Sequence, residues 1–109
     1  MEKLSISIFP YPSKRKELLS ACRIIASRSF EEVGCMDSRI LSTSGEDNAV
    51  RFEQHWRHKD HLESYFQSEH FTALLGAMKL LATSYELIIN DGSSSEGTLF
   101  VAQARNKKG

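Results

Sequence analysis

The hydrophobic pattern of this chain predicts an α+β fold, in which helices alternate with strands in a fixed order. Residues 3–9 alternate apolar and polar side chains, which is the pattern of a half-buried strand. Apolar residues then recur at helical spacing over residues 13–34 and again over residues 58–81. The segments between and after these helices have the pattern of further strands, so both kinds of element contribute to one core.

Strands are separated in this sequence by proline, glycine and short polar stretches. Pro10 and Pro12 end the first strand, because proline cannot continue a hydrogen-bonded ladder. Residues 44–48 form a polar turn, so the strands on either side of it are expected to pair as a hairpin. A Gly/Ser loop at residues 92–97 precedes the last strand. Five strands are expected, at residues 3–9, 35–43, 49–56, 85–91 and 98–104.

The helices have recognisable ends. Ser13 is the expected N-cap of the first helix, and Gly34 is its expected end. Ser68 divides the second helical region and can cap a new segment, so two short helices or one broken helix fit equally well. The apolar stripe of the first helix is Leu18, Cys22, Ile25, Ala26, Phe30 and Val33, and that of the last is Phe71, Leu74, Leu75, Met78 and Leu81.

The order strand, helix, strand, strand, helix, strand is the ferredoxin-like split βαβ arrangement, here with one additional C-terminal strand. Residues 1–104 are expected to form one domain, and residues 105–109 a frayed tail. In this arrangement the helices cover one face of the sheet, and no helix is left to cover the other. Pairing two such sheets in a homodimer is the simplest way to cover it, and the additional strand would lie along the partner's sheet edge.

Composition excludes several classes of protein. The 109 residues carry 14 basic and 14 acidic side chains, so no net charge draws the chain to nucleic acid or to an anionic membrane. No stretch approaches the roughly 18 apolar residues of a membrane span, and no signal peptide is visible at the start. The two cysteines, Cys22 and Cys35, are expected to be free thiols. A cytoplasmic location is the default expectation.

Two segments carry a resemblance to a known family. One is W-R-H-K-D-H-L-E-S-Y-F-Q-S-E-H-F-T-A-L-L at residues 56–75, and the other is P-x-K-x-x-E-L-L at residues 12–19, where the first helix begins. Together with the Gly34-Cys35 helix exit, they resemble the antibiotic biosynthesis monooxygenase family of the dimeric α+β barrel superfamily. The resemblance covers roughly residues 3–91.

The resemblance implies a homodimer whose open sheet faces meet in a barrel, with a small-molecule pocket between sheet and helices in each subunit. It further implies a monooxygenase that oxidises a quinol or polycyclic phenol with molecular oxygen and uses no metal, flavin or other cofactor. Relatives degrade haem or isomerise small metabolites. The family usually has glutamate where this chain has Gln54 and often histidine where it has Tyr65, and haem degradation requires an asparagine that residues 3–9 lack. A non-catalytic binding protein and an isomerase therefore stay as alternatives.

Three residues are the expected catalytic set, each with a structural alternative. Trp56 would provide a wall on which a planar substrate stacks, or it is a core tryptophan where strand meets helix. His70 would remove a phenolic proton, or it bonds to nearby backbone at a helix start. Tyr65 lies on a core-facing helix stripe, and its hydroxyl would reach either a substrate or a protein partner.

The expected substrate-binding set is Gln54, Phe52, Phe71 and Arg39. Gln54 interrupts an apolar row, so its amide would orient a substrate or bond to a neighbouring strand. Arg39 would hold an anionic group, although pairing with a carboxylate on its own or the adjacent strand is the simpler explanation. A further spacing, His55-x-x-His58-x-x-His61, suggests a metal site, but it runs from a strand into a helix, and no bound metal is expected.

Overall fold

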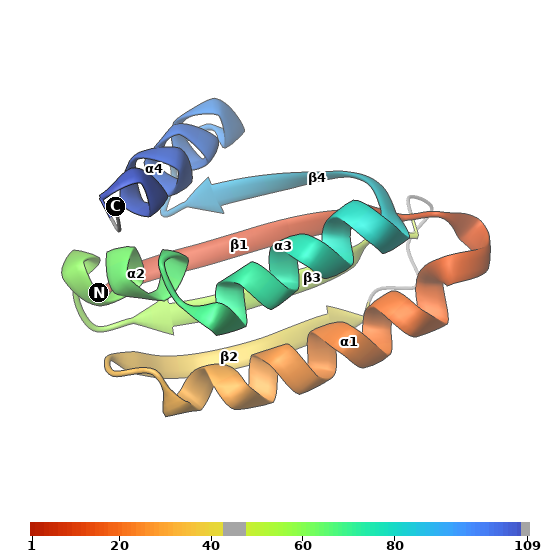
Figure 1. The fold of residues 1–109 in the computed structure, drawn as a ribbon, viewed down its shortest axis with the longest axis horizontal. Coiled ribbons are helices and arrows are strands. Elements are labelled where there is room, and N and C mark those ends of the chain that lie inside the picture. The colour runs from red at the N-terminus through yellow and green to blue at the C-terminus, as the bar shows by residue number, and fades with distance from the viewer. Residues whose placement is uncertain (43–47, 108–109) are drawn as a thin grey trace.

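The computed structural model describes residues 1–42 and 48–107, and its centre is a four-stranded antiparallel sheet (Figure 1). The strands lie in the order β2-β3-β1-β4, and the ferredoxin-like fold predicted from the sequence is confirmed. The hairpin between β2 and β3 is present, although residues 44–47 of its predicted polar turn lie outside the described residues. The strands are β1 (Glu2–Pro10), β2 (Cys35–Ser42), β3 (Val50–Trp56) and β4 (Ala82–Ile89).

Helices α1 and α3 lie side by side on one face of this sheet (Figure 1). Two short helices are present around the predicted division, and the Ser68 side chain accepts a hydrogen bond from the Phe71 N–H, 3.2 Å away, as an N-cap. The helices are α1 (Arg15–Arg28), α2 (Lys59–Phe66), α3 (Glu69–Leu81) and α4 (Ser94–Asn106), with short 3-10 turns at η1 (Pro12–Lys14) and η2 (Ser29–Glu31).

The predicted limits of the first helix were wrong at both ends. Ser13 lies inside η1, and Lys14 precedes α1 without any side-chain cap. The α-helix ends at Arg28, because the chain tightens into η2 before the turn at Gly34, whose φ of 89° is readily adopted by glycine. The predicted apolar stripe therefore stops early, and Phe30 and Val33 are exposed.

The core lies between the sheet and helices α1, α2 and α3. Alternating residues of β1 face it, and antiparallel pairing places Leu4 opposite Gln54 and Ile6 opposite Phe52 of β3. Because the side-chain period of a strand is two, this register brings every second residue of β3 to the same buried face. Gln54 is thus fixed inside the core by the strand that carries it.

The face of the sheet away from α1 and α3 is dominated by polar and charged side chains. Lys3 and Glu53 are 3.8 Å apart across β1 and β3, and Arg51 donates a hydrogen bond of 2.8 Å to the hydroxyl of Ser7. Apolar side chains are interspersed among them, and Ile88 of β4 pairs beside Ser5 of β1. Among residues 1–42 and 48–107, no helix covers this open face (Figure 1).

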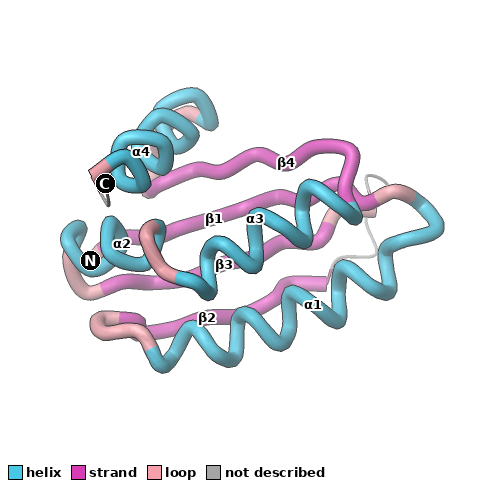
Figure 2. Tube along the Cα trace, in the orientation of Figure 1, coloured by secondary structure: helices cyan, strands magenta, loops and turns pink. Residues whose placement is uncertain are grey.

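The C-terminal segment is a helix, so the fifth strand predicted at residues 98–104 was wrong. Ser93 caps α4 by accepting a hydrogen bond from the Glu96 N–H, and the helix lies beside the free edge of β4 (Figure 2). Arg105, expected in a frayed tail, belongs to α4 and donates a 2.7 Å hydrogen bond to the carbonyl of Phe66. Across residues 1–42 and 48–107, no helix combines the length and apolarity that a membrane span needs.

Candidate functional site

An aromatic cluster occupies the space where β3 meets α2 and α3. The rings of Trp56 and Tyr65 lie 4.6 Å apart between centroids, and the Phe71 ring meets Tyr65 edge-on at 5.5 Å. These separations are typical of favourable aromatic pairs. Phe66 completes the cluster at 4.8 Å from Phe71, and all four side chains are fully buried. Trp56, Tyr65 and Phe71, predicted from the sequence as site residues, are therefore brought together.

Gln54 links the polar atoms of this cluster. Its Oε1 accepts a hydrogen bond from the Trp56 indole Nε1–H at 3.2 Å. Its Nε2 donates to the Ser38 hydroxyl on β2 at 2.9 Å and to the Tyr65 hydroxyl at 3.4 Å. Ser29 lies 3.1 Å from the same Tyr65 oxygen and donates to the Ile25 carbonyl. Each of these buried polar groups is thus bonded to protein, as buried polar groups generally are.

Burial also sets the acid–base character of the cluster. The pKa of the Tyr65 hydroxyl is raised to about 12, because desolvation of the phenolate outweighs the hydrogen bonds from Ser29 and Gln54. A phenol with this pKa stays protonated near neutral pH, so Tyr65 donates or accepts hydrogen bonds and does not act as a base. Phe52 lies on the same buried face of β3 and supplies apolar surface only.

His70 lies outside this cluster, in the first turn of α3. Its Nδ1 is 3.0 Å from a Glu32 carboxylate oxygen, and its Nε2 is 3.5 Å from one of Glu31. The ring is partly exposed, with 24% of the side chain accessible. These two contacts tie the start of α3 to the segment after α1, and they leave the imidazole reachable from solvent.

Arg39 lies on the open face of the sheet, opposite to the aromatic cluster. Its guanidinium donates from Nε to Asp37 Oδ2 at 2.8 Å, and its Nη2 contacts the same oxygen. Hydrogen bonding to this guanidinium lowers the pKa of the Asp37 carboxyl. The structure therefore separates Arg39 from the other predicted substrate-binding residues. It pairs Arg39 with Asp37, a carboxylate on the same strand, as the simpler of the two sequence-based explanations predicted.

The histidines and cysteines that suggested other chemistry are dispersed. His55 lies on the open face near Asp37, whereas the His58 and His61 rings lie 5.4 Å apart around the start of α2. Within residues 1–42 and 48–107, no three His, Cys, Asp or Glu side chains are grouped to hold a metal ion. Both cysteines are free, and burial raises the pKa of the Cys22 thiol to about 12 and that of Cys35 to about 11.

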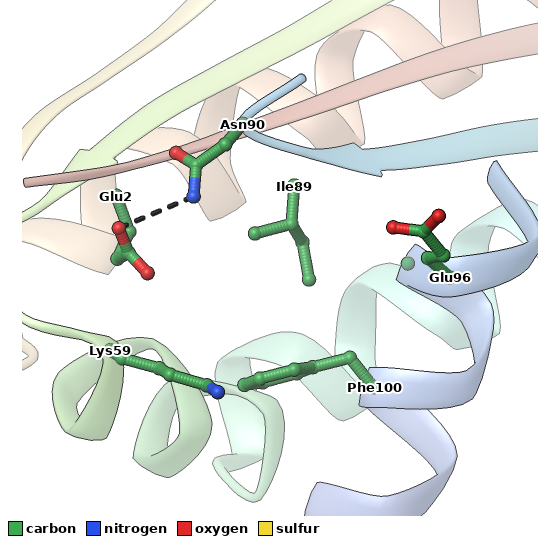
Figure 3. Close-up of a pocket in the computed structure, with 7 residues that line it drawn as sticks. Glu2, Lys59, Ile89, Asn90, Glu96 and Phe100 are labelled. Atoms are coloured by element: carbon green, nitrogen blue, oxygen red, sulfur yellow. Dashed lines mark hydrogen bonds between the residues drawn. The ribbon is translucent and has the colours of Figure 1, made fainter. Parts of the chain in front are cut away.

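Helix α4 borders several cavities, among them cavities of about 200, 220, 430 and 480 Å³, and none of these is lined by a described residue of the predicted site. One has mixed charges: Figure 3 shows Glu2 and Glu96 on its walls, with the Lys59 ammonium beside the Phe100 ring, 5.3 Å from the centroid. Another, which we call the α4 cavity, lies between α3, β4 and α4 and has predominantly apolar walls. Its lining residues are Leu75, Lys79, Tyr85, Leu87, Thr98, Val101 and Ala102.

Sequence reasoning missed the α4 cavity because it assigned residues 98–104 to a strand. A signal was present, since Ser93 followed by Glu96 is a capping box, which marks a helix start. With a helix there, Thr98, Val101 and Ala102 fall on one helical face through their spacing of three and four residues. The capping box could thus have predicted the helix and this face, although the cavity also needs α3 and β4.

The sheet order and the helices on one face define a ferredoxin-like α+β protein. The family model of antibiotic biosynthesis monooxygenases matches residues 2–76, so this chain belongs to that family. The match covers the aromatic cluster and ends before α4 begins. Comparison with curated proteins finds no match.

Solved structures share the fold at low sequence identity. A protein from Nitrosomonas europaea, assigned to the antibiotic biosynthesis monooxygenases, aligns with a TM-score of 0.75 at 14% identity and covers 84% of this chain and 98% of its own. Another antibiotic biosynthesis monooxygenase aligns with a TM-score of 0.73 at 18% sequence identity, and it covers 84% of this chain and 98% of its own. A conserved protein from Bacteroides thetaiotaomicron aligns with a TM-score of 0.75 at 18% sequence identity, and it covers 82% of this chain and 94% of its own.

Proposed function

We propose that this protein binds a small, largely apolar aromatic molecule in the α4 cavity, on the helix-covered side of its sheet. The observation that carries the proposal is the apolar wall formed by Leu75, Leu87 and Val101 around a volume of about 220 Å³. An apolar cavity of about 150 Å³ suffices for benzene, so a compound with one or two rings fits here. Mostly apolar walls with a few polar groups are the usual composition of a small-molecule site.

A filled-cavity variant tests this proposal. In Ala102→Phe a ring is added at a lining residue that is itself exposed, so the fold should persist while the cavity shrinks. We expect 1-naphthol to raise the melting temperature of the wild-type protein and to leave that of Ala102→Phe unchanged. Ala73→Phe, at an exposed position of α3 outside the cavity lining, is the matched control. Equal stabilisation of Ala102→Phe and wild type would place binding elsewhere.

A second candidate function is oxidation of a small aromatic molecule by oxygen without a bound cofactor, at the aromatic cluster and not in the α4 cavity. The observation that favours it is the convergence of Trp56, Tyr65 and Gln54 within a chain that belongs to the monooxygenase family. His70, next to Phe71 of the aromatic cluster, would take the phenolic proton. One oxygen atom would enter the ring of a quinol as a hydroxyl and the other would leave as water, while the quinol is oxidised to a hydroxyquinone, so the substrate supplies all four electrons.

An oxygen electrode separates the two candidates. Binding alone predicts no oxygen uptake with quinols or polycyclic phenols, although the ligand stabilises the protein. Catalysis predicts uptake that persists with a chelator and is abolished in His70→Ala. Absorbance spectra of the same samples check for flavin and haem.

The proposal includes a homodimer formed through the open sheet faces, because none of the helices in the described part of the chain lies over this face. Closing two sheets on each other would leave the aromatic cluster and the α4 cavity on the outer, helical side of each subunit. A cytoplasmic setting is part of the proposal as well, since free Cys22 and Cys35 suit a reducing compartment.

A further inference from the structure

We infer that the α4 cavity selects aromatic carboxylates, with the ring between α3, β4 and α4 and the carboxylate at Lys79. This inference rests on the proposed binding function and adds the chemical class of the ligand. Lys79 is the only charged residue among the described residues that line the cavity, and the remaining walls are apolar or carry a hydroxyl. A ligand that matches these walls therefore has an apolar body and one negative charge.

Helical geometry places the lysine beside the apolar wall. Leu75 and Lys79 are four residues apart on α3, so they lie on the same helical face, one turn from each other. A lysine side chain can lay its methylene stem along apolar surface and keep its ammonium at the rim. Leu75 and Lys79 thus contribute apolar surface and a cationic side chain to the cavity lining from one helix.

The ammonium of Lys79 is free to take an external partner. Over the described part of the chain it forms neither an ion pair nor a hydrogen bond, whereas Lys3, Lys14 and Lys107 each have a carboxylate within 4 Å. Glu86, which is the nearest acidic residue along β4, follows Tyr85 and precedes Leu87 and so points to the opposite face of the sheet. A bound carboxylate would meet Lys79 without a competing charge from β4.

Hydroxyl groups supply further polar contacts in the same cavity. Tyr85 of β4 and Thr98 of α4 both line it, and within the described chain neither hydroxyl is bonded to protein. A carboxylate has two oxygens, so it can accept from the ammonium and from one hydroxyl together. A neutral amide of the same shape has one acceptor oxygen and forms no ion pair with the ammonium, so its bond to Lys79 is weaker.

The wall contributed by α4 is held in place by its C-terminal end. Arg105 donates to the Phe66 carbonyl at 2.7 Å and to the Thr72 hydroxyl at 3.1 Å, and Gln67 donates to the Ala104 carbonyl at 2.9 Å. These contacts join α4 to the junction of α2 and α3. Since the family match ends at residue 76, selectivity at Lys79 and Thr98 belongs to the part of the chain beyond it.

Titration of the full chain with a charged and a neutral ligand of one shape tests the inference. The probes are 1-naphthoate and 1-naphthamide, and the readout is the Kd from NMR chemical shifts. We expect naphthoate to bind more tightly than naphthamide, and Lys79→Gln to weaken naphthoate about threefold while leaving naphthamide unchanged. Lys16→Gln, at an exposed lysine of α1, is the matched control and should alter neither Kd.

The possible outcomes distinguish binding in the α4 cavity from the preference for carboxylates. If both probes bind equally and Lys79→Gln changes neither, binding stands and the preference for carboxylates is overturned. If Lys16→Gln weakens naphthoate as much as Lys79→Gln does, the preference reflects overall charge and the assignment to Lys79 is overturned. If neither probe binds at all, the proposed function fails together with the inference.

Discussion

Gln54 is the residue on which the other polar groups of the aromatic cluster depend. Its amide accepts from Trp56 and donates to both Ser38 and Tyr65, so one side chain joins two strands and α2. Leaving a buried donor without a partner costs about 1–3 kcal/mol, whereas losing one of several bonds costs about 1 kcal/mol. The members of this network should therefore differ in how much each contributes to stability.

We expect Gln54→Leu to destabilise the protein by about 2–3 kcal/mol, because the Trp56 N–H then loses its acceptor inside the core. Tyr65→Phe should cost about 1 kcal/mol, since Ser29 and Gln54 each keep another partner. Urea unfolding of the two variants beside wild type measures both values. The hydrogen-bonded account is wrong if Tyr65→Phe proves the more damaging of the two.

Tyr65 also predicts how stability falls at high pH. Its pKa is raised to about 12 in the folded protein, so the folded state holds the proton more tightly than the unfolded chain, whose tyrosine has a pKa near 10. The contribution is fully present below about pH 10 and is lost as the pH rises toward 12. The pKa values of the Cys22 and Cys35 thiols are raised to about 12 and about 11, so these groups add a further loss of stability that starts near pH 9.

We therefore expect the urea midpoint of the wild-type protein to fall between about pH 8 and about pH 11. The urea midpoint of Tyr65→Phe should fall less over the same interval, because this variant has no phenol to ionise at that position. Both proteins keep Cys22 and Cys35, so their difference isolates the tyrosine. Parallel curves for the two proteins would show that Tyr65 titrates normally in the folded state.

At the scale of elements, α4 depends on a close approach to β4. The Asn90 N–H donates to the Lys3 carbonyl, and such bonds alternate along an antiparallel pair, so the Leu87 carbonyl points away from β1 toward α4. A Cβ at Gly97 would overlap that carbonyl oxygen. Glycine at this position therefore lets a helix cover an edge that would otherwise be open to another strand.

Two glycines of the helices provide a matched pair of variants. Gly97→Ala should destabilise the protein by about 1–3 kcal/mol, because the backbone of β4 or α4 must shift to admit the methyl group. Gly76→Ala in α3 meets no atom within 4 Å, so it should stabilise by up to about 1 kcal/mol through helix propensity. Thermal unfolding of both variants checks the opposite signs. A neutral or stabilising Gly97→Ala would contradict the close packing of α4 on β4.

How far the sequence predicted these elements depended on the strength of each local pattern. The alternation in β1 and β3 and the Ser68 cap come from neighbouring residues, and all three were predicted correctly. Residues 98–104 carry a mixed pattern that fits strand or helix, and packing against the β4 edge decides in favour of helix. Short apolar runs are ambiguous in this way until their tertiary partner is known.

The candidate site was predictable to a similar degree. The sequence placed Gln54 and Trp56 on one face of a strand and Tyr65 on a core-facing helix stripe, and the structure brings these three together. The sequence could not show the hydrogen bonds that join this group to Ser29 and Ser38, because these two serines lie in distant segments of the chain. The α4 cavity needs three elements at once and so was beyond reach of local patterns.

At the scale of the whole molecule, the open sheet face decides how two copies would meet. Its ion pairs, such as Lys3 with Glu53, lie within one subunit, so they do not repel a second copy placed over them. Apolar side chains are interspersed among these charges and would be buried on closure. Ile88 lies on this face beside Ser5, one residue from the Leu4–Ile89 end of the β1–β4 pair. A charged side chain introduced there would lose its hydration in the closed dimer, where Glu86 is the acidic side chain on the same face of β4.

The dimer proposal is tested by Ile88→Arg. We expect wild type to have twice the chain mass of 12.3 kDa in light scattering, and Ile88→Arg to have the single-chain mass. Burying a charge in an interface removes its hydration, and a penalty of about 3 kcal/mol weakens association roughly a hundredfold. Ile24→Arg, on the exposed side of α1, is the matched control and should remain a dimer. A monomeric wild type would overturn the proposal, and a dimeric Ile88→Arg with monomeric Ile24→Arg would move the interface to the helical side.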